Sequence, residues 1–156
     1  MSKKFLKGSA TAYRGRDGVT LIEVVLSLAL IVLIFGIATP IYQDYQIRNG
    51  VDISVNTIVE NLRRAQILSE AVDGDSTWGV NITSGNITLF KGASFVARDS
   101  SFDESSDMLS SILPSGLTEI VFSKLDGFPN NVGILTLTAN GTSRTISINE
   151  KGTVIF

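Results

Sequence analysis

The chain has 156 residues, enough for one domain of ordinary size, and a formal net charge of −2. It contains no cysteine and no histidine, which excludes a disulfide framework and a thiolate zinc site and removes the commonest general base. Residues 1–18 hold five basic residues and one acidic residue, a balance of +4, and the remaining eight basic and fourteen acidic residues give −6. An acidic remainder argues against a nucleic-acid surface, so we expect no nucleic-acid partner.

The first segment, residues 1–18, is short, polar and basic, and we interpret it as a leader peptide. The apolar run that follows, residues 19–41, is long enough as a helix to span the roughly 30 Å of a bilayer core. A basic segment before such a run stays on the cytoplasmic side of a membrane. The sequence therefore predicts a single-pass protein of the cytoplasmic membrane, with its C-terminal domain outside the cytoplasm.

The position of the apolar run also indicates where the chain is processed. A secretory signal peptide has an apolar stretch of about 7 to 15 residues, followed by its cleavage site. Here the run is longer, and the small residues near its end, Gly36 and Ala38, are followed closely by Pro40. A cut before the run, after Gly18, is the better interpretation, and it would give Val19 a free amine.

Beyond residue 41 we expect the helix to continue to about Val72 with a different character. Asp44 precedes Arg48, and Glu60 precedes Arg64, each at the four-residue spacing that favours a helix. An apolar stripe follows the helical period and comprises Ile47, Val51, Val55, Ile58, Leu62 and Ala65.

From Trp78 onward the sequence changes to the pattern of β-strands separated by turn residues. Predicted strands cover Trp78 to Thr83, Asn86 to Lys91, Thr118 to Phe122, Gly133 to Thr138, Arg144 to Ile148 and Thr153 to Phe156. Ser84-Gly85, Asn140-Gly141 and Lys151-Gly152 are predicted hairpin turns. Asp99 to Ser106 is predicted to be a polar loop.

These elements predict an α+β fold. A long N-terminal helix, with a transmembrane half and an amphipathic half, packs on a C-terminal antiparallel sheet of about five to six strands. We divide the chain into a leader (1–18), a transmembrane and assembly helix (19–41) and a globular domain (42–156).

Glu23 is the only charged residue between positions 19 and 41. A lone carboxylate on an apolar helix is costly to bury, and a cation is the remedy. The free amine of Val19 lies one turn earlier in the same chain, where helix geometry disposes it poorly for close contact. A neighbouring chain displaced along the helix axis can bring its own amine to Glu23, and in a low-dielectric setting that pairing selects one register.

The string Gly18-Val19-Thr20-Leu21-Ile22-Glu23, standing before a long apolar helix, resembles the cleavage and methylation motif of type IV pilins and type II secretion pseudopilins. One departure is Val19, where the family usually has Phe. The resemblance implies that a prepilin peptidase cuts between Gly18 and Val19 and methylates the new amine of Val19. It also implies that Glu23 is the assembly glutamate.

The same resemblance implies a pilin-like fold and a structural role. Gly36 and Pro40 resemble the family's helix-loosening positions, although a simple helix kink remains an alternative. The implied partners are the prepilin peptidase, other pilin or pseudopilin subunits, a pilus assembly platform, and the membrane before assembly into a cell-surface or periplasmic filament. No catalytic residue, metal or cofactor is predicted.

Three functions remain open at this point. The stretch Asn61 to Thr83 resembles minor pilins and minor pseudopilins, and the missing C-terminal cysteine pair also favours a minor subunit. A major pilin is the second possibility, and a membrane-anchored extracytoplasmic binding domain is the third.

An acidic stretch offers either a Ca²⁺ site or, as we prefer, a solvated loop; it contains Asp99, Asp103, Glu104 and Asp107.

Overall fold

The computed structural model describes residues 18–156, and for residues 37–41 and 43 it describes the backbone alone. Of the predicted leader, only Gly18 is therefore described. The chain divides into two compact units between Thr39 and Pro40.

Helix α1 (Leu21–Glu70) has residues in both units. Its N-terminal part, residues 21–36, is apolar except for a few positions, and its large side chains are exposed. Among the described residues, no helix has an apolar stretch long enough to cross a membrane. The predicted localisation, a single-pass protein of the cytoplasmic membrane, was therefore wrong.

The second half of α1 supplies one side of the core. The predicted apolar stripe is confirmed: Val51, Val55, Ile58, Leu62 and Ala65 are buried, and Ile47 packs against them. Their three- and four-residue spacing places them on one helix face, which the strands cover.

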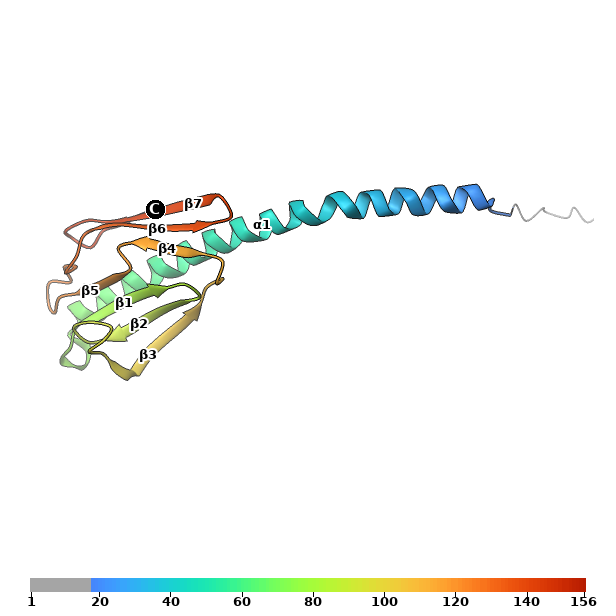
Figure 1. The fold of residues 1–156 in the computed structure, drawn as a ribbon. Helices are drawn as coiled ribbons and strands as arrows, with labels where there is room; N and C mark the ends of the chain where they lie inside the picture. The colour runs from blue at the N-terminus through green and yellow to red at the C-terminus, as the bar shows by residue number, and fades with distance from the viewer. Residues whose placement is uncertain (1–17) are drawn as a thin grey trace, which may run out of the picture. The chain divides into compact units, whose positions relative to one another are not determined.

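Helix α1 is followed by a short 3₁₀ helix, η1 (Asp73–Asp75), and by eight strands within the described residues. One four-stranded sheet, sheet A, has the order β3-β2-β1-β5, and a second, sheet B, has the order β4-β6-β7-β8. Figure 1 shows both sheets beside the second half of α1. The strands are β1 (Trp78–Thr83), β2 (Asn86–Lys91), β3 (Asp99–Asp107), β4 (Leu113–Gly116), β5 (Glu119–Phe122), β6 (Gly133–Ala139), β7 (Thr142–Ile148) and β8 (Val154–Ile155).

The predicted fold class was wrong, because the chain is richer in sheet than we expected. The prediction was one sheet of five to six strands and a helix with a transmembrane half, whereas the strands form two antiparallel sheets. The cause lies between residues 113 and 122, where β4 joins sheet B by pairing with β6 and β5 then joins sheet A by pairing with β1. The chain thus crosses between the two sheets, which strand propensity alone does not reveal.

Two strands were missed altogether. Strand β3 lies where we predicted a polar loop, and it pairs with β2 at the edge of sheet A. Strand β4 contains Pro114 and Gly116, residues that disfavour a strand interior, and it also lies at a sheet edge.

The two sheets differ in how their outer faces are covered. In sheet A, Trp78, Val80 and Ile82 face the core, while Phe90 is also fully buried although it lies outside that core. The segment after β2 covers it, since the Phe95 ring meets the Phe90 ring edge-on at 5.6 Å. The part of sheet A around Phe90 is therefore covered on both faces.

In sheet B, Leu135 and Leu137 of β6 are buried, and Thr138 on the opposite face is exposed. This alternation is the pattern expected for a sheet with one face in the core and one in water.

Candidate functional site

The predicted cleavage site lies immediately before α1. Gly18, Val19 and Thr20 are exposed and have no regular secondary structure, and, among the described residues other than its chain neighbours, none lies within 4 Å of a methyl group added at Gly18. The Gly18–Val19 peptide bond is thus accessible and outside the helix. A peptidase could bind this backbone without first unwinding α1.

Thr20 accepts the first backbone hydrogen bonds of α1 and so determines where the helix starts. Its carbonyl oxygen accepts from Glu23 N at 3.1 Å and from Val24 N at 3.2 Å, and its Oγ1 lies 3.4 Å from Glu23 N. Thr20 and Glu23 have the spacing of a capping box, in which Ser or Thr is followed three residues later by Glu or Gln. The negative charge of Glu23 also interacts favourably with the positive, N-terminal end of the helix dipole. This signal is visible in the sequence and gives Glu23 a local role at the start of α1, while its role in assembly stays a prediction.

The surroundings of Glu23 are apolar and open. Its carbonyl oxygen accepts a hydrogen bond from Ser27 Oγ at 2.7 Å, so Ser27 bonds to its own helix. The large apolar side chains of this segment are exposed by between 47% and 83%, and among them are Val19, Leu21, Ile22, Val24, Val25, Leu26, Leu28, Leu30, Ile31, Val32, Leu33 and Ile34. We call residues 19–34 the apolar segment.

Gly36 and Pro40 lie at the other end of the apolar segment, and the backbone at both is helical. In an α-helix the amide of residue 40 donates to the carbonyl of residue 36, and proline has no amide hydrogen to donate. The two predicted helix-loosening positions are therefore the two ends of one missing helical hydrogen bond. The Pro40 side chain lies outside the described residues.

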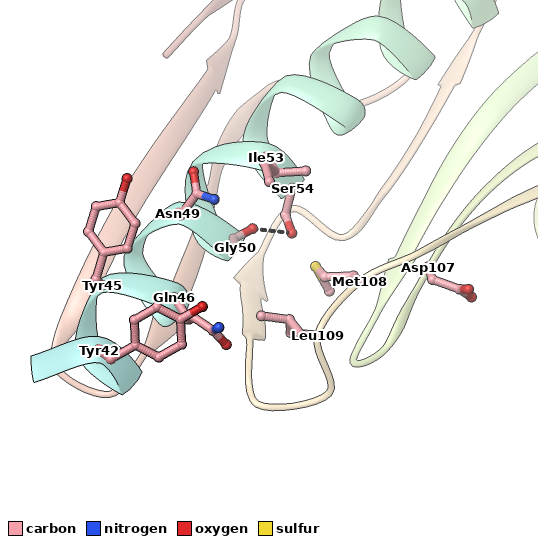
Figure 2. Close-up of a pocket in the computed structure, with 10 residues that line it drawn as sticks. All are labelled: Tyr42, Tyr45, Gln46, Asn49, Gly50, Ile53, Ser54, Asp107, Met108 and Leu109. Carbon is pink, nitrogen blue, oxygen red and sulfur yellow. Dashed lines mark hydrogen bonds between the residues drawn. The ribbon is translucent and has the colours of Figure 1, made fainter. Parts of the chain in front are cut away.

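A groove on the described surface lies elsewhere, on the second half of α1. It has a volume of about 490 Å³, and Figure 2 shows Tyr42, Tyr45 and Gln46 on the helix near Met108 and Leu109, which follow β3. Gly50 allows α1 to lie close to Leu109, because a methyl group at Gly50 would collide with the Leu109 side chain. Asp107 is the one carboxylate among the residues that line it, so the groove holds no arrangement of acid, base and nucleophile.

The predicted acidic stretch is extended, not looped. Asp103 is paired with Arg98 at 2.7 Å, and Glu104 is paired through both oxygens with Arg64 of α1 at 2.6 Å. Within the described part of the chain, no three acidic residues converge in a way that could hold a metal ion. Asp103 thus pairs with the residue that directly precedes β3, and Glu104 connects β3 to α1.

Comparison with protein-family models, with curated proteins and with solved structures found no match to this chain. The interpretation of the site therefore depends on the residues themselves and on the resemblance of the segment around Gly18 and Glu23.

Proposed function

We propose that this chain is a structural subunit of a type IV pilus or of a type II secretion-like pseudopilus. A prepilin peptidase cuts it between Gly18 and Val19 and methylates the Val19 amine. The processed chain joins a filament of like subunits, with the help of an assembly platform, through the N-terminal part of α1. A minor subunit is the preferred role, because the chain has no cysteine pair.

The observation that carries this proposal is the exposure of the apolar segment. Each large aliphatic side chain that moves from water into an apolar contact contributes about 1.5–3 kcal/mol. For the twelve side chains named above, covering them would release on the order of 20 kcal/mol. Helices of neighbouring subunits supply such cover, since they carry the same segment.

Glu23 gives that packing a single register. When neighbouring helices exclude water, its carboxylate needs a cation, and the amine of Val19 in the next subunit is one that processing creates. At an effective dielectric constant of about 20, two unit charges about 4 Å apart attract by about 4 kcal/mol. An unpaired Glu23 in the same setting would oppose assembly, so cleavage and assembly are linked.

The test is the substitution Glu23→Ala, expressed in cells that make the filament, with Glu60→Ala as the matched control. Glu60 is also an exposed glutamate of α1, but it lies in the half that packs on the sheets. We expect both variants to be cleaved after Gly18 and only Glu60→Ala to enter filaments normally. If Glu23→Ala enters filaments as well as the wild-type chain does, the pairing is refuted; if the wild-type chain is never cleaved, the proposed function is refuted.

A further inference from the structure

The chain contains two Asn-Gly pairs that lie in different backbone settings. Asn49-Gly50 lies inside helix α1, and Asn140-Gly141 forms the two-residue turn between β6 and β7. Both asparagines are exposed. An Asn-Gly pair is chemically labile, because glycine has no side chain to keep its backbone nitrogen away from the preceding side-chain amide. The two pairs therefore share one chemistry and differ in the conformation of the backbone that carries them.

The backbone nitrogen of Gly141 is available for reaction. Asn140 and Gly141 have φ angles of 44° and 77°, which is the pattern of a type I′ hairpin turn. Ala139 pairs with Thr142 across this turn, and within the described residues the Gly141 amide donates to no backbone carbonyl. No described residue other than its chain neighbours lies within 4 Å of a methyl group added at Gly141. Neither a backbone hydrogen bond nor crowding therefore opposes reaction at this nitrogen.

The corresponding nitrogen of Gly50 is held by the helix. Gly50 lies in the interior of α1, where the amide of residue 50 donates to the carbonyl of residue 46. Its position is also confined by the Leu109 side chain, with which a methyl group at Gly50 would collide. The helix must open locally before this nitrogen can reach the Asn49 side chain, and that requirement slows the reaction.

We propose that Asn140 is a site of deamidation, a spontaneous covalent modification of this chain. The Gly141 nitrogen attacks Cγ of Asn140, and the bond from Cγ to Nδ2 breaks. Nδ2 leaves as ammonia and takes the Gly141 proton with it, so that a succinimide ring forms. Water then opens the ring: its oxygen bonds to a ring carbonyl carbon as the bond from that carbon to nitrogen breaks, and the nitrogen regains a proton. The products carry aspartate or isoaspartate at position 140.

This modification changes a contact between the hairpin formed by β6 and β7 and helix α1. Asn140 Nδ2 donates to Asp44 Oδ1 of α1 at 2.9 Å. The nitrogen that leaves is the atom that donates this hydrogen bond, and an ionised carboxylate in its place can only accept. Two carboxylates would then face each other, and like charges repel. Deamidation therefore replaces an attraction between the hairpin and α1 with a repulsion.

A second contact limits how far the hairpin can move. Arg144 Nε of β7 pairs with Asp52 Oδ1 of α1 at 2.8 Å, about two helical turns beyond Asp44. We therefore expect the tip of the hairpin to open while the part held by Arg144 stays in place. The inference is independent of the proposed function, since all of these residues belong to the unit of residues 40–156.

The first test compares the two asparagines within one molecule. The full-length chain is kept in mildly alkaline buffer with mild detergent, and peptide mapping by mass spectrometry follows the product at each asparagine over time. We expect Asn140 to react about tenfold faster than Asn49, the ratio that corresponds to about 1.4 kcal/mol for opening one helical hydrogen bond. In denaturant the two rates should become equal, because the folded backbone no longer distinguishes the two sites.

Equal rates in the folded chain, or no product at Asn140, would overturn the proposal. A difference of the same size in denaturant would also overturn it, because the flanking sequence and not the fold would then be the cause.

The second test isolates the effect on the hairpin. Asn140→Asp reproduces the aspartate product, and Asn49→Asp is the matched control on α1. Amide hydrogen exchange next to the turn should become about tenfold faster in Asn140→Asp, the effect of losing one hydrogen bond, and should be unchanged in Asn49→Asp. Trp78 fluorescence shows that each variant is folded.

A double variant, Asp44→Asn with Asn140→Asp, exchanges the donor and the acceptor of this contact. The hydrogen bond can then form in the opposite direction, so exchange should return to the wild-type rate. Unchanged exchange in Asn140→Asp, or exchange in the double variant that stays as fast as in Asn140→Asp, would refute the role of this contact.

Discussion

Ser69 links the end of α1 to the first strand of sheet A. Its side chain is completely buried, and its Oγ accepts a hydrogen bond from Trp78 N at 2.9 Å. Its carbonyl oxygen accepts from Leu125 N at 3.2 Å. One small side chain thus accepts from the buried backbone amide at the start of β1.

Replacing Ser69 with alanine should destabilise the fold by about 1–3 kcal/mol, because the buried Trp78 amide would lose this hydrogen bond and a small cavity would remain. Thr57→Ala is the control: Thr57 Oγ1 donates only to Ile53 O of its own helix, at 3.0 Å and in an exposed position, so its loss should cost about 0.5 kcal/mol or less. Denaturant unfolding followed by the fluorescence of Trp78, the single tryptophan, measures both. Equal midpoints for the two variants would contradict this role of Ser69.

At Asp99 the predicted effect is one of pH. The Ser101 hydroxyl donates to Asp99 Oδ1 at 2.6 Å and the Ser101 amide donates to the same atom at 3.1 Å, and these two bonds hold the pKa of Asp99 below its ordinary value. Because the folded pKa is the lower one, the associated stability is present above the unfolded pKa of about 3.9 and is lost as the pH falls through the folded pKa.

Ser101→Ala should therefore raise the pKa of Asp99 toward that of an unstructured peptide. An NMR titration of the Asp99 carboxyl carbon measures the change, with Ser105→Ala as a variant of the same strand that should leave the titration in place. An unchanged pKa in Ser101→Ala would show that the serine is not the cause.

Single residues also show where sequence spacing was misleading. Glu60 precedes Arg64 by four residues, which predicted a pair along the helix, but Arg64 is paired with Glu104 of β3. Asp44 was assigned to Arg48, and it accepts instead from Asn140 Nδ2 at 2.9 Å. The spacing of charged residues along a helix shows which residues can pair within that helix. It does not show the partners that distant strands bring close to the helix.

At the scale of elements, the packing of sheet A depends on a missing side chain in β1. A methyl group at Gly79 would lie 2.7 Å from Ile120 O and 2.7 Å from Phe90 Cζ, closer than real contacts allow. Strand β1 lies between β2 and β5, so it has no free edge toward which it could move.

Gly79→Ala should therefore lower the stability of the fold by about 1–3 kcal/mol, although alanine ordinarily suits a strand better than glycine. Gly36→Ala is the control, since no described residue beyond its own stretch of helix lies within 4 Å of the added methyl there, and it should leave the Trp78 unfolding transition unchanged. Thermal unfolding measures both. A Gly79→Ala variant as stable as the wild type would mean that the strands around β1 can separate to admit the methyl group.

The strands divide into those that the sequence could predict and those that it could not. Strands β1, β2, β6 and β7 have buried residues and well-defined turns between them, and all four were correctly predicted. Strand β3, with the sequence DSSFDESSD, has one large apolar residue, Phe102, and is exposed along most of its length. An edge strand that is polar on both faces has no alternation to detect, and its charges discourage other chains from pairing with it.

At the scale of the whole molecule, the sequence predicted which residues need partners better than it predicted the arrangement of the sheets. The apolar stripe of α1 was identified from its period and is covered by the strands. The division of the strands into two sheets was missed, because it depends on whether β4 pairs with β6 or with a strand of sheet A, a choice made by long-range contacts. The predicted membrane localisation was overturned by a different finding: among the described residues, no helix is long and apolar enough to cross a membrane.

We propose that the chain is processed after Gly18 and built into a filament through α1. The most direct measurement is the intact mass of this subunit in sheared, purified filaments, together with its N-terminal sequence. The proposal predicts a chain that begins at Val19 and carries one added methyl group on its amine. A chain in the filaments that still begins at Met1, or filaments that lack the chain entirely, would contradict it.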